Sequence, residues 1–219
     1  MNRRRLILTV LVIAAAGFGG ATWYATRTGQ TANGQGIAPE IAEALIRPHS
    51  PILGPEEAPV TIVEFFDPAC EACRAFHPVV KDIMAEHGDA VRVVIRYTPF
   101  HGQGSDVAIL TLEAARMQGI FEEVLEAILR EQPRWASHGN MRPDLVPSIA
   151  IDAGLDMEAA RAQVKAPEII AAINQDRADV KTVGVRRTPT FFVNGKPLDP
   201  FGEAELRALV AAEVAAAGS

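Results

Sequence analysis

The chain has 219 residues, 48% of them hydrophobic, and a formal net charge of −6. The first 27 residues carry four arginines and no acidic residue, so the remainder holds 17 basic and 27 acidic side chains, a net charge of −10. This charge argues against a nucleic-acid partner and does not attract the chain to anionic lipid. About 190 residues after this segment are enough for one domain with a sizeable core.

The amino terminus reads as an export segment. Three arginines at residues 3–5 precede residues 6–25, twenty residues without a charge. A helix of that length rises about 30 Å, the thickness of the hydrocarbon core of a bilayer. We therefore predict a signal anchor over residues 1–27, with the arginines on the cytoplasmic side and a single pass through the inner (cytoplasmic) membrane. The alternative is a signal peptide cleaved near Gly19 or Ala21, which would leave the domain soluble in the periplasm. Both readings place the domain in the periplasm or outside the cell.

Further along the chain, the pattern predicts a strand, a helix and a second strand. Residues 60–66 are almost continuously apolar, as in a strand that is buried on both faces, although Glu64 interrupts them. Residues 70–86 have helical spacing, with Pro78 inside the helix. Residues 91–97 are again rich in β-branched and apolar side chains.

The rest of the chain is mostly helical in pattern. Residues 107–128 keep three-and-four apolar spacing, including Met117 and Phe121, and Pro133 is expected to end this run. Shorter helices are expected after it, the last of them ending at Gly184. The chain then closes with a β-hairpin and a final alanine-rich helix, expected over residues 190–193, 196–199 and 203–217.

The only two cysteines of the chain, Cys70 and Cys73, follow the first predicted strand three residues apart. Two thiols at this spacing can form a disulfide across one helical turn, and a sulfur at the start of the helix lies at the positive end of the dipole, which favours the thiolate. The thiolate is the nucleophile of disulfide exchange, and the second thiol can release a mixed disulfide. The alternatives are two unrelated buried thiols or half of a zinc site, for which the chain has no second pair of cysteines.

A metal site remains a second hypothesis for the same thiols. His77 lies one helical turn beyond Cys73, and His101 follows the second predicted strand. With the two cysteines they could bind copper or zinc, which would make the protein a periplasmic metallochaperone. The other interpretation is that both histidines are surface or packing residues. We prefer redox chemistry with no metal and no cofactor, and keep the metallochaperone as the alternative function.

Three markers together resemble the DsbA-like branch of the thioredoxin superfamily. They are Val63-Glu64-Phe65-Phe66-Asp67 before the thiols, Cys70-x-x-Cys73 with Phe76 behind them, and Gly184-Val185-x-x-Thr188-Pro189-Thr190 before the hairpin. The resemblance covers roughly residue 50 to the end of the chain. It implies an α/β, thioredoxin-like fold with an all-helical insertion, and an enzyme that exchanges disulfides with protein substrates and with a membrane or soluble redox partner.

The composition of the amino-terminal segments and this resemblance together divide the chain, and the resemblance implies roles for four residues. The expected parts are the signal anchor 1–27, a tether 28–50 that includes a short helix near residues 39–46, and a domain 51–219 whose helical insertion covers about 104–183. Cys70 is expected to be the nucleophile, exposed at the helix start, and Cys73 the resolving thiol. Pro189 resembles the cis proline that faces the two sulfurs and presents backbone to the substrate, and Thr188 could add a hydroxyl contact near Cys70. Without the resemblance, Pro189 reads equally well as a trans proline at the start of a strand.

Glu64 lies six residues before Cys70, where members of this superfamily carry a buried acid. Burial in an apolar strand should raise the pKa of its carboxyl group, so that Glu64 can relay a proton through water to Cys73. The alternative is a glutamate on an edge strand that points into solvent.

The dipeptide Glu71-Ala72 between the cysteines departs from the Pro-His pair best known in this family. It supplies no imidazole to stabilise the Cys70 thiolate, and Glu71 adds a like charge beside it. Arg187 could lie near the sulfurs and offset that charge, or belong to a solvated basic turn. The sequence therefore leaves open whether the enzyme oxidises, reduces or isomerises its substrates.

Overall fold

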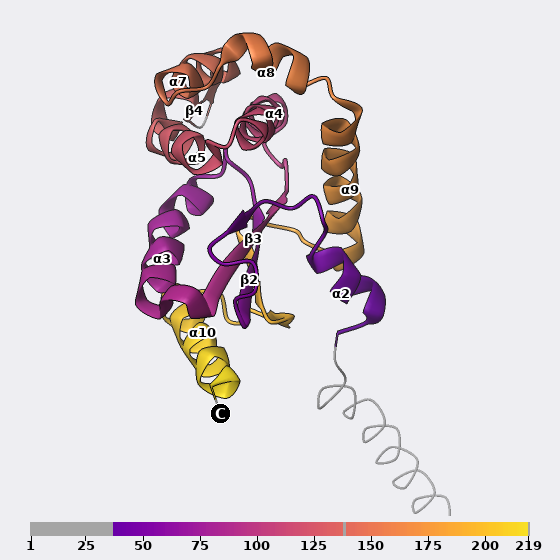
Figure 1. Ribbon diagram of the computed structural model, residues 1–219, viewed down its shortest axis with the longest axis vertical. Coiled ribbons are helices and arrows are strands. Elements are labelled where there is room, and N and C mark those ends of the chain that lie inside the picture. Colours follow the sequence, from indigo (N-terminus) through magenta and orange to yellow (C-terminus); the bar gives the residue numbers. More distant parts are fainter. Residues whose placement is uncertain (1–36, 138, 219) are drawn as a thin grey trace, which may run out of the picture. The chain divides into compact units, whose positions relative to one another are not determined.

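The central sheet brings together strands that lie far apart in the sequence (Figure 1). In the computed structural model, which describes residues 37–137 and 139–218, the order of the sheet is β1-β3-β2-β6-β7. The strands are β1 (Ile52–Leu53), β2 (Val60–Phe66), β3 (Val91–Tyr97), β6 (Thr190–Val193) and β7 (Lys196–Pro197). The signal anchor predicted over residues 1–27 lies outside the described residues. Among the residues that are described, no helix combines the length and apolarity that a membrane span needs.

β2 lies in the middle of the sheet, parallel to β3 and antiparallel to β6. The helix α3 (Glu71–His87) makes the crossover from β2 to β3 and continues through Pro78. All seven residues of β2 are buried, as its apolar run predicts, because helices cover both faces of the sheet. Figure 1 shows α3 and α10 (Glu203–Ala217) on one side of the sheet and α2 (Pro39–Leu45) and α9 (Pro167–Val183) on the other.

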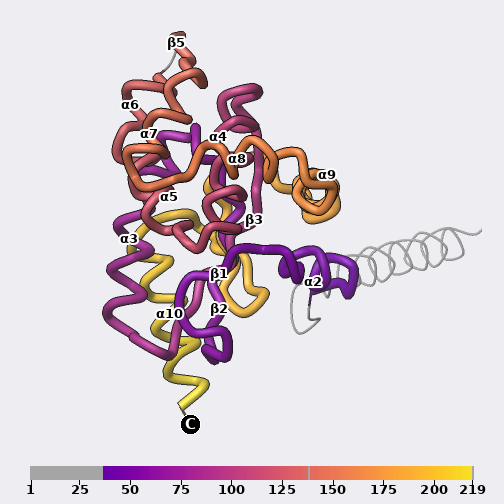
Figure 2. The backbone as a smooth tube through the Cα atoms, turned by 45° about the horizontal axis from the view of Figure 1, so that its top comes forward, coloured from indigo at the N-terminus to yellow at the C-terminus, as the bar shows by residue number. Residues whose placement is uncertain are grey.

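The segment between β3 and β6 forms the predicted insertion, but it is not wholly helical (Figure 2). A small hairpin, β4 (Ala136–Ser137) with β5 (Asn140–Met141), interrupts it. Pro133 does not end the preceding run but lies in the first turn of a short helix, where its missing N–H costs no hydrogen bond. Met117, expected on the buried stripe, is 47% exposed. The α-helices of this insertion that precede α9 are α4 (Gln103–Met117), α5 (Phe121–Arg130), α6 (Gln132–Trp135), α7 (Val146–Asp152) and α8 (Met157–Gln163).

The tether predicted over residues 28–50 extends too far, because its last residues belong to the folded domain. Residues from Pro39 onward belong to the same packed unit as the rest of the domain, and α2 packs against α9. Ala44 and Leu45 are buried in this contact, which a freely moving linker would not provide. The domain therefore begins near residue 39 rather than at residue 51.

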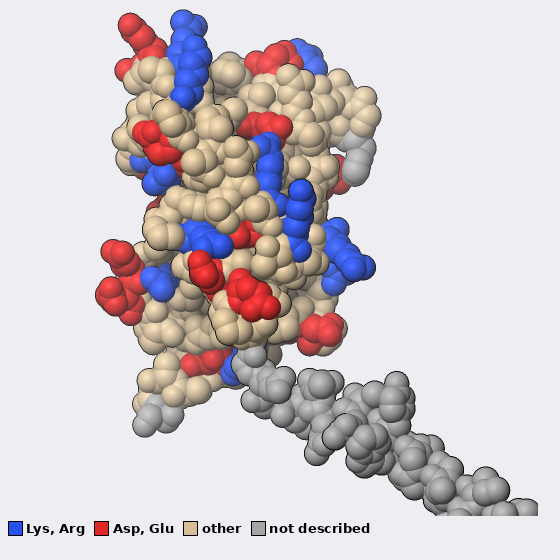
Figure 3. All heavy atoms as spheres, turned by 90° about the vertical axis from the view of Figure 1, so that its right-hand side faces the viewer, with Lys and Arg blue, Asp and Glu red and all other residues tan. Residues whose placement is uncertain are grey.

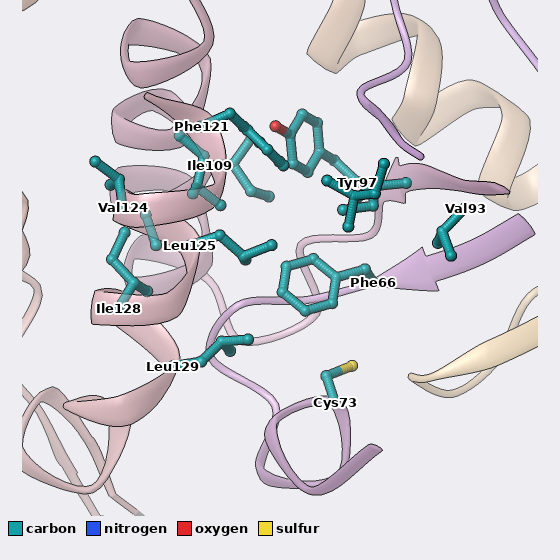
Figure 4. Close-up of a cluster of buried hydrophobic side chains, with 14 of the residues drawn as sticks. Phe66, Cys73, Val93, Tyr97, Ile109, Phe121, Val124, Leu125, Ile128 and Leu129 are labelled. Carbon is teal, nitrogen blue, oxygen red and sulfur yellow. The ribbon is translucent and has the colours of Figure 1, made fainter. Parts of the chain in front are cut away.

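The insertion and the sheet share one hydrophobic core, part of which Figure 4 shows. Phe66 and Tyr97, at the ends of β2 and β3, meet apolar side chains of α4 and α5, and Cys73 of α3 lies in the same cluster. Burying each of these large side chains contributes about 1.5–3 kcal/mol. The resolving cysteine is thus fixed inside the core. On the face of the molecule in Figure 3, basic and acidic side chains are interspersed, so that face has no continuous basic surface.

Candidate active site

Cys70 is the residue that immediately precedes α3, and it has extended backbone angles. The turn that leads to it is held by Asp67, whose carbonyl oxygen accepts a hydrogen bond from Cys70 N at 3.0 Å. Cys70 is 8% exposed and Cys73 0%, and both are free thiols. Cys70 is therefore the more accessible of the two, although it is more covered than the expected exposed thiol, because the Thr188–Pro189 loop lies against it.

That loop approaches the nucleophile through its backbone. The Thr188–Pro189 peptide bond is cis, as the resemblance implies, and the loop leads directly into β6. Sγ of Cys70 lies 3.3 Å from the carbonyl oxygen of Thr188, to which it donates a hydrogen bond only while it is protonated. The contact thus joins the start of α3 to the start of β6, 118 residues apart in the sequence.

The two thiols have opposite pKa shifts. A hydrogen bond from the Cys73 thiol, helped by the Thr188 side chain and by the backbone N–H groups of Cys73 and Ala72, lowers the pKa of Cys70 to about 5 against the opposing effect of burial. Burial, followed by the hydrogen bond to Cys70 and the charge of Glu64, raises the pKa of Cys73 well above its ordinary value. At neutral pH the pair therefore consists of a thiolate at Cys70 and a protonated thiol at Cys73.

This difference predicts a selective reaction with alkylating agents. The rate at which iodoacetamide modifies Cys70 should titrate with a pKa near 5, and Cys73 should remain unmodified at pH 7. Cys73→Ala should raise the pKa of Cys70, because it removes the largest stabilising hydrogen bond, whereas Cys73→Ser keeps a donor and should raise it less. Rates measured by intact mass between pH 4 and 10 test this. A wild-type Cys70 that titrates with the ordinary pKa of a free cysteine, about 8.5, would contradict this prediction.

Glu64 is a buried acid in the middle of the sheet. It is 4% exposed, and its Oε1 atom has no hydrogen-bond partner among the described residues. Burial, followed by the negative charge of Cys70, raises the pKa of Glu64 to about 8. The alternative of an edge-strand glutamate is wrong, because β2 lies between β3 and β6. Glu64 consequently holds a proton at neutral pH and interacts electrostatically with both sulfurs.

Asp67 is a site residue whose role the sequence did not reveal. Its carboxylate is fully buried, and its backbone N–H lies 3.5 Å from the Cys73 sulfur. One of its oxygens lies 2.7 Å from Nδ1 of His101. The other donors to this carboxylate are Ala69 N (2.9 Å), Phe100 N (2.8 Å), His101 N (3.2 Å) and Ser105 Oγ (2.9 Å).

The structure does not gather the histidines and the thiols into a single metal site. Nε2 of His77 lies 3.6 Å from Glu126 on α5, and His101 is held by Asp67. Within residues 37–137 and 139–218, no group of three or more histidine, cysteine or acidic side chains is placed to hold a metal ion. Arg187 lies with its guanidinium 5.5 Å from the ring centre of Phe201, so a cation–π contact accounts for its position.

Comparison with known proteins adds four similarities. The sequence model of a family described as Thioredoxin matches residues 47–212, which include both cysteines, Glu64 and Pro189. The crystal structure of a thioredoxin-like oxidoreductase from Silicibacter pomeroyi DSS-3 has 33% sequence identity and a TM-score of 0.67, over 80% of this chain and 96% of that chain. Disulfide bond formation protein D of Bacillus subtilis (strain 168) is 27% identical over 163 residues, which cover 70% of this chain and 71% of that protein. A Na(+)/H(+) antiporter NhaA of Herminiimonas arsenicoxydans is 35% identical over 147 residues, which are 67% of this chain but 22% of that protein.

Proposed function

The chain belongs to the thioredoxin family, in its branch of DsbA-like thiol:disulfide oxidoreductases, and from this premise we propose that it exchanges disulfides with protein substrates through Cys70 and Cys73. The resemblance and the enzyme class predicted from the sequence are confirmed. The observation that carries the proposal is the opposite protonation of the two thiols, with the thiolate on the more accessible sulfur.

In the proposed reaction, Cys70 forms the mixed disulfide with the substrate. Cys73 is the leaving thiol when the protein oxidises a substrate, and it is the resolving thiol when the reaction runs in reverse. A substrate thiolate attacks Cys70 in the oxidised protein, and Cys73 leaves with a proton that Glu64 is suited to supply. A second substrate thiol then attacks the substrate sulfur of this mixed disulfide, Cys70 leaves as the thiolate, and the substrate departs as a disulfide from the reduced protein. We assign Thr188 and Pro189 to substrate binding beside Cys70, because their loop already contacts the sulfur through the Thr188 carbonyl.

The proposed direction is oxidation of the substrate. A stabilised thiolate favours the reduced form of the protein and so makes its disulfide more oxidising. The pKa of Cys70, about 5, lies between the nucleophile pKa values of about 7 in thioredoxin and about 3.5 in DsbA. Hydrogen bonds from Cys73 and Thr188 thus replace the stabilisation that the Glu71-Ala72 dipeptide lacks.

We further propose that the domain works outside the cytoplasm, either tethered by residues 1–27 or released after their cleavage. The support for this is the charge pattern of that segment, three arginines followed by twenty uncharged residues. A redox partner in the membrane or in the periplasm would reoxidise the cysteine pair after each turnover.

Trapping the intermediate tests the assignment of the two cysteines. Reduced Cys73→Ser protein, incubated with a peptide disulfide, should accumulate a mixed disulfide on Cys70, because the resolving thiol is gone. Cys70→Ser should form no adduct and lose exchange activity altogether. Intact mass before and after treatment with dithiothreitol measures the adduct. If Cys70→Ser retains activity while Cys73→Ser forms no adduct, the roles are wrong.

A further inference from the structure

Cys70 lines a cavity of about 520 Å³ that three separate segments enclose. The first is the start of α3, with Cys70 and Glu71, and the second is the β4–β5 hairpin. His101, from the loop between β3 and α4, supplies the third wall. A substrate thiol that reaches Cys70 from this cavity therefore meets the imidazole of His101.

The imidazole is held in one orientation by a buried carboxylate. Nδ1 of His101 lies 2.7 Å from Asp67, whose oxygens are fixed by backbone N–H groups and by Ser105. When Nδ1 donates its proton to Asp67, the lone pair of the neutral ring is on Nε2. Nε2 forms no hydrogen bond with any described residue, and the side chain is 35% exposed. An accessible base that a third group orients is the arrangement expected of an acid–base catalyst.

Among the residues that the structure describes, few other ionisable groups face this ring. Asp67 meets it from the β2–α3 turn, and Cys70 and Glu71 face the cavity from α3. The described cavity residues of the hairpin are Ala136, Ser137, Gly139, Asn140 and Met141, none of them ionisable. Glu64 is buried within β2, so its carboxyl group does not line this cavity.

We propose that His101 is a further catalytic residue, whose Nε2 removes the proton from the substrate thiol as it attacks the Cys70–Cys73 disulfide. The proton moves from the substrate sulfur to Nε2, and the substrate sulfur bonds to the sulfur of Cys70. The Cys70–Cys73 bond breaks, its electron pair passes to Cys73, and Cys73 takes the proton of Glu64. The substrate sulfur is oxidised and the Cys73 sulfur is reduced. Asp67 is a positioning residue in this step, which rests on the proposed function.

The variant His101→Asn tests this step. Its amide can still donate to Asp67, but it has no basic nitrogen. The oxidised protein is mixed with a reduced two-cysteine peptide, and the loss of the Cys70–Cys73 disulfide is followed by acid quench, alkylation and intact mass between pH 6.5 and 9.5. His87→Asn, at the last residue of α3, is the matched control.

At pH 7 we expect His101→Asn to react about tenfold more slowly than the wild type, less than the roughly 10²–10⁴-fold typical of general bases, because a few per cent of the peptide thiol is already ionised. The ratio should approach one above about pH 9, where the peptide thiol, with an ordinary pKa of about 8.5, is already ionised. Titration of Glu64 affects both proteins and cancels in this ratio, and His87→Asn should match the wild type throughout. Equal rates at pH 7, or the same slowing at every pH, would overturn the role of His101. A wild-type disulfide that the peptide does not reduce at any pH would overturn the proposed function itself.

Discussion

The variant Glu64→Gln should match the stability of the wild-type protein near pH 4.5 and exceed it by several kcal/mol at pH 8. Folded Glu64 keeps its proton up to a pKa of about 8, whereas the unfolded chain loses it above about 4.5. Between these values the folded state binds more protons, so the wild-type protein loses stability as the pH rises. At about 1.4 kcal/mol for each pH unit, the loss over this window is on the order of 5 kcal/mol. Glutamine does not titrate and avoids it.

Urea unfolding of the disulfide form between pH 4.5 and 8.5 measures this effect. The oxidised protein is used because, in the reduced protein, the lowered pKa of Cys70 makes stability rise with pH and opposes the effect of Glu64. Burial, the larger cause of the Glu64 shift, remains in the oxidised form. Glu57→Gln, an exposed position in the loop before β2, is the control and should show no such window. A stability difference between Glu64→Gln and the wild type that is independent of pH would contradict the account.

Arg96→Met should destabilise the domain by about 3–5 kcal/mol, since it leaves buried carboxylates without their partner. Arg96 is fully buried on β3, and its guanidinium donates to Asp176 at 2.7 Å and to Asp179 at 2.7 Å. Burial alone would raise the pKa of Asp179, but hydrogen bonds from Arg47 and Arg96 outweigh it and lower that pKa to about 2. The cluster therefore joins β3 to α9 and to the segment after α2.

Arg177→Met is the matched control, because Arg177 of α9 also pairs with an aspartate, Asp106 of α4, but both of these side chains are 42% exposed. An exposed pair of this kind contributes about 0–1 kcal/mol. Urea unfolding at pH 7 should therefore separate the two arginines by at least about 2 kcal/mol. Equal losses for both variants would mean that burial does not set the strength of the Arg96 cluster.

The long elements could be predicted from local pattern. The strands over residues 60–66 and 91–97 and the helix over residues 203–217 have the predicted bounds, because continuous apolar runs or helical spacing end at Gly, Pro or polar residues. β1 and the β4–β5 hairpin were missed, since strands of two residues have no period to read. The packing of residues 39–50 was also missed, because it depends on contacts with α9, over a hundred residues away.

Some residues of the candidate site could likewise be predicted from local sequence, and others could not. Cys70, Cys73, Glu64 and Pro189 belong to short local motifs that the sequence displays directly. The contact of Asp67 with His101 joins residues 34 positions apart, and it exists because parallel β2 and β3 end at the same edge of the sheet, with Phe66 opposite Tyr97. An acid and a histidine that each follow the carboxyl end of neighbouring parallel strands are the signal that could have revealed this pair.

The reduction potential of the Cys70–Cys73 pair tests the central claim most directly. The protein is equilibrated in glutathione buffers and alkylated, and the reduced and oxidised forms are counted by intact mass. The pKa of Cys70 lies between those of the nucleophilic cysteines of thioredoxin and DsbA. We therefore expect one two-electron couple with a potential of about −200 mV, between about −270 mV for thioredoxin and about −120 mV for DsbA. A potential at or below about −270 mV, or the absence of a disulfide between the two cysteines at any buffer ratio, would contradict an oxidising exchange enzyme that acts through a stabilised Cys70 thiolate.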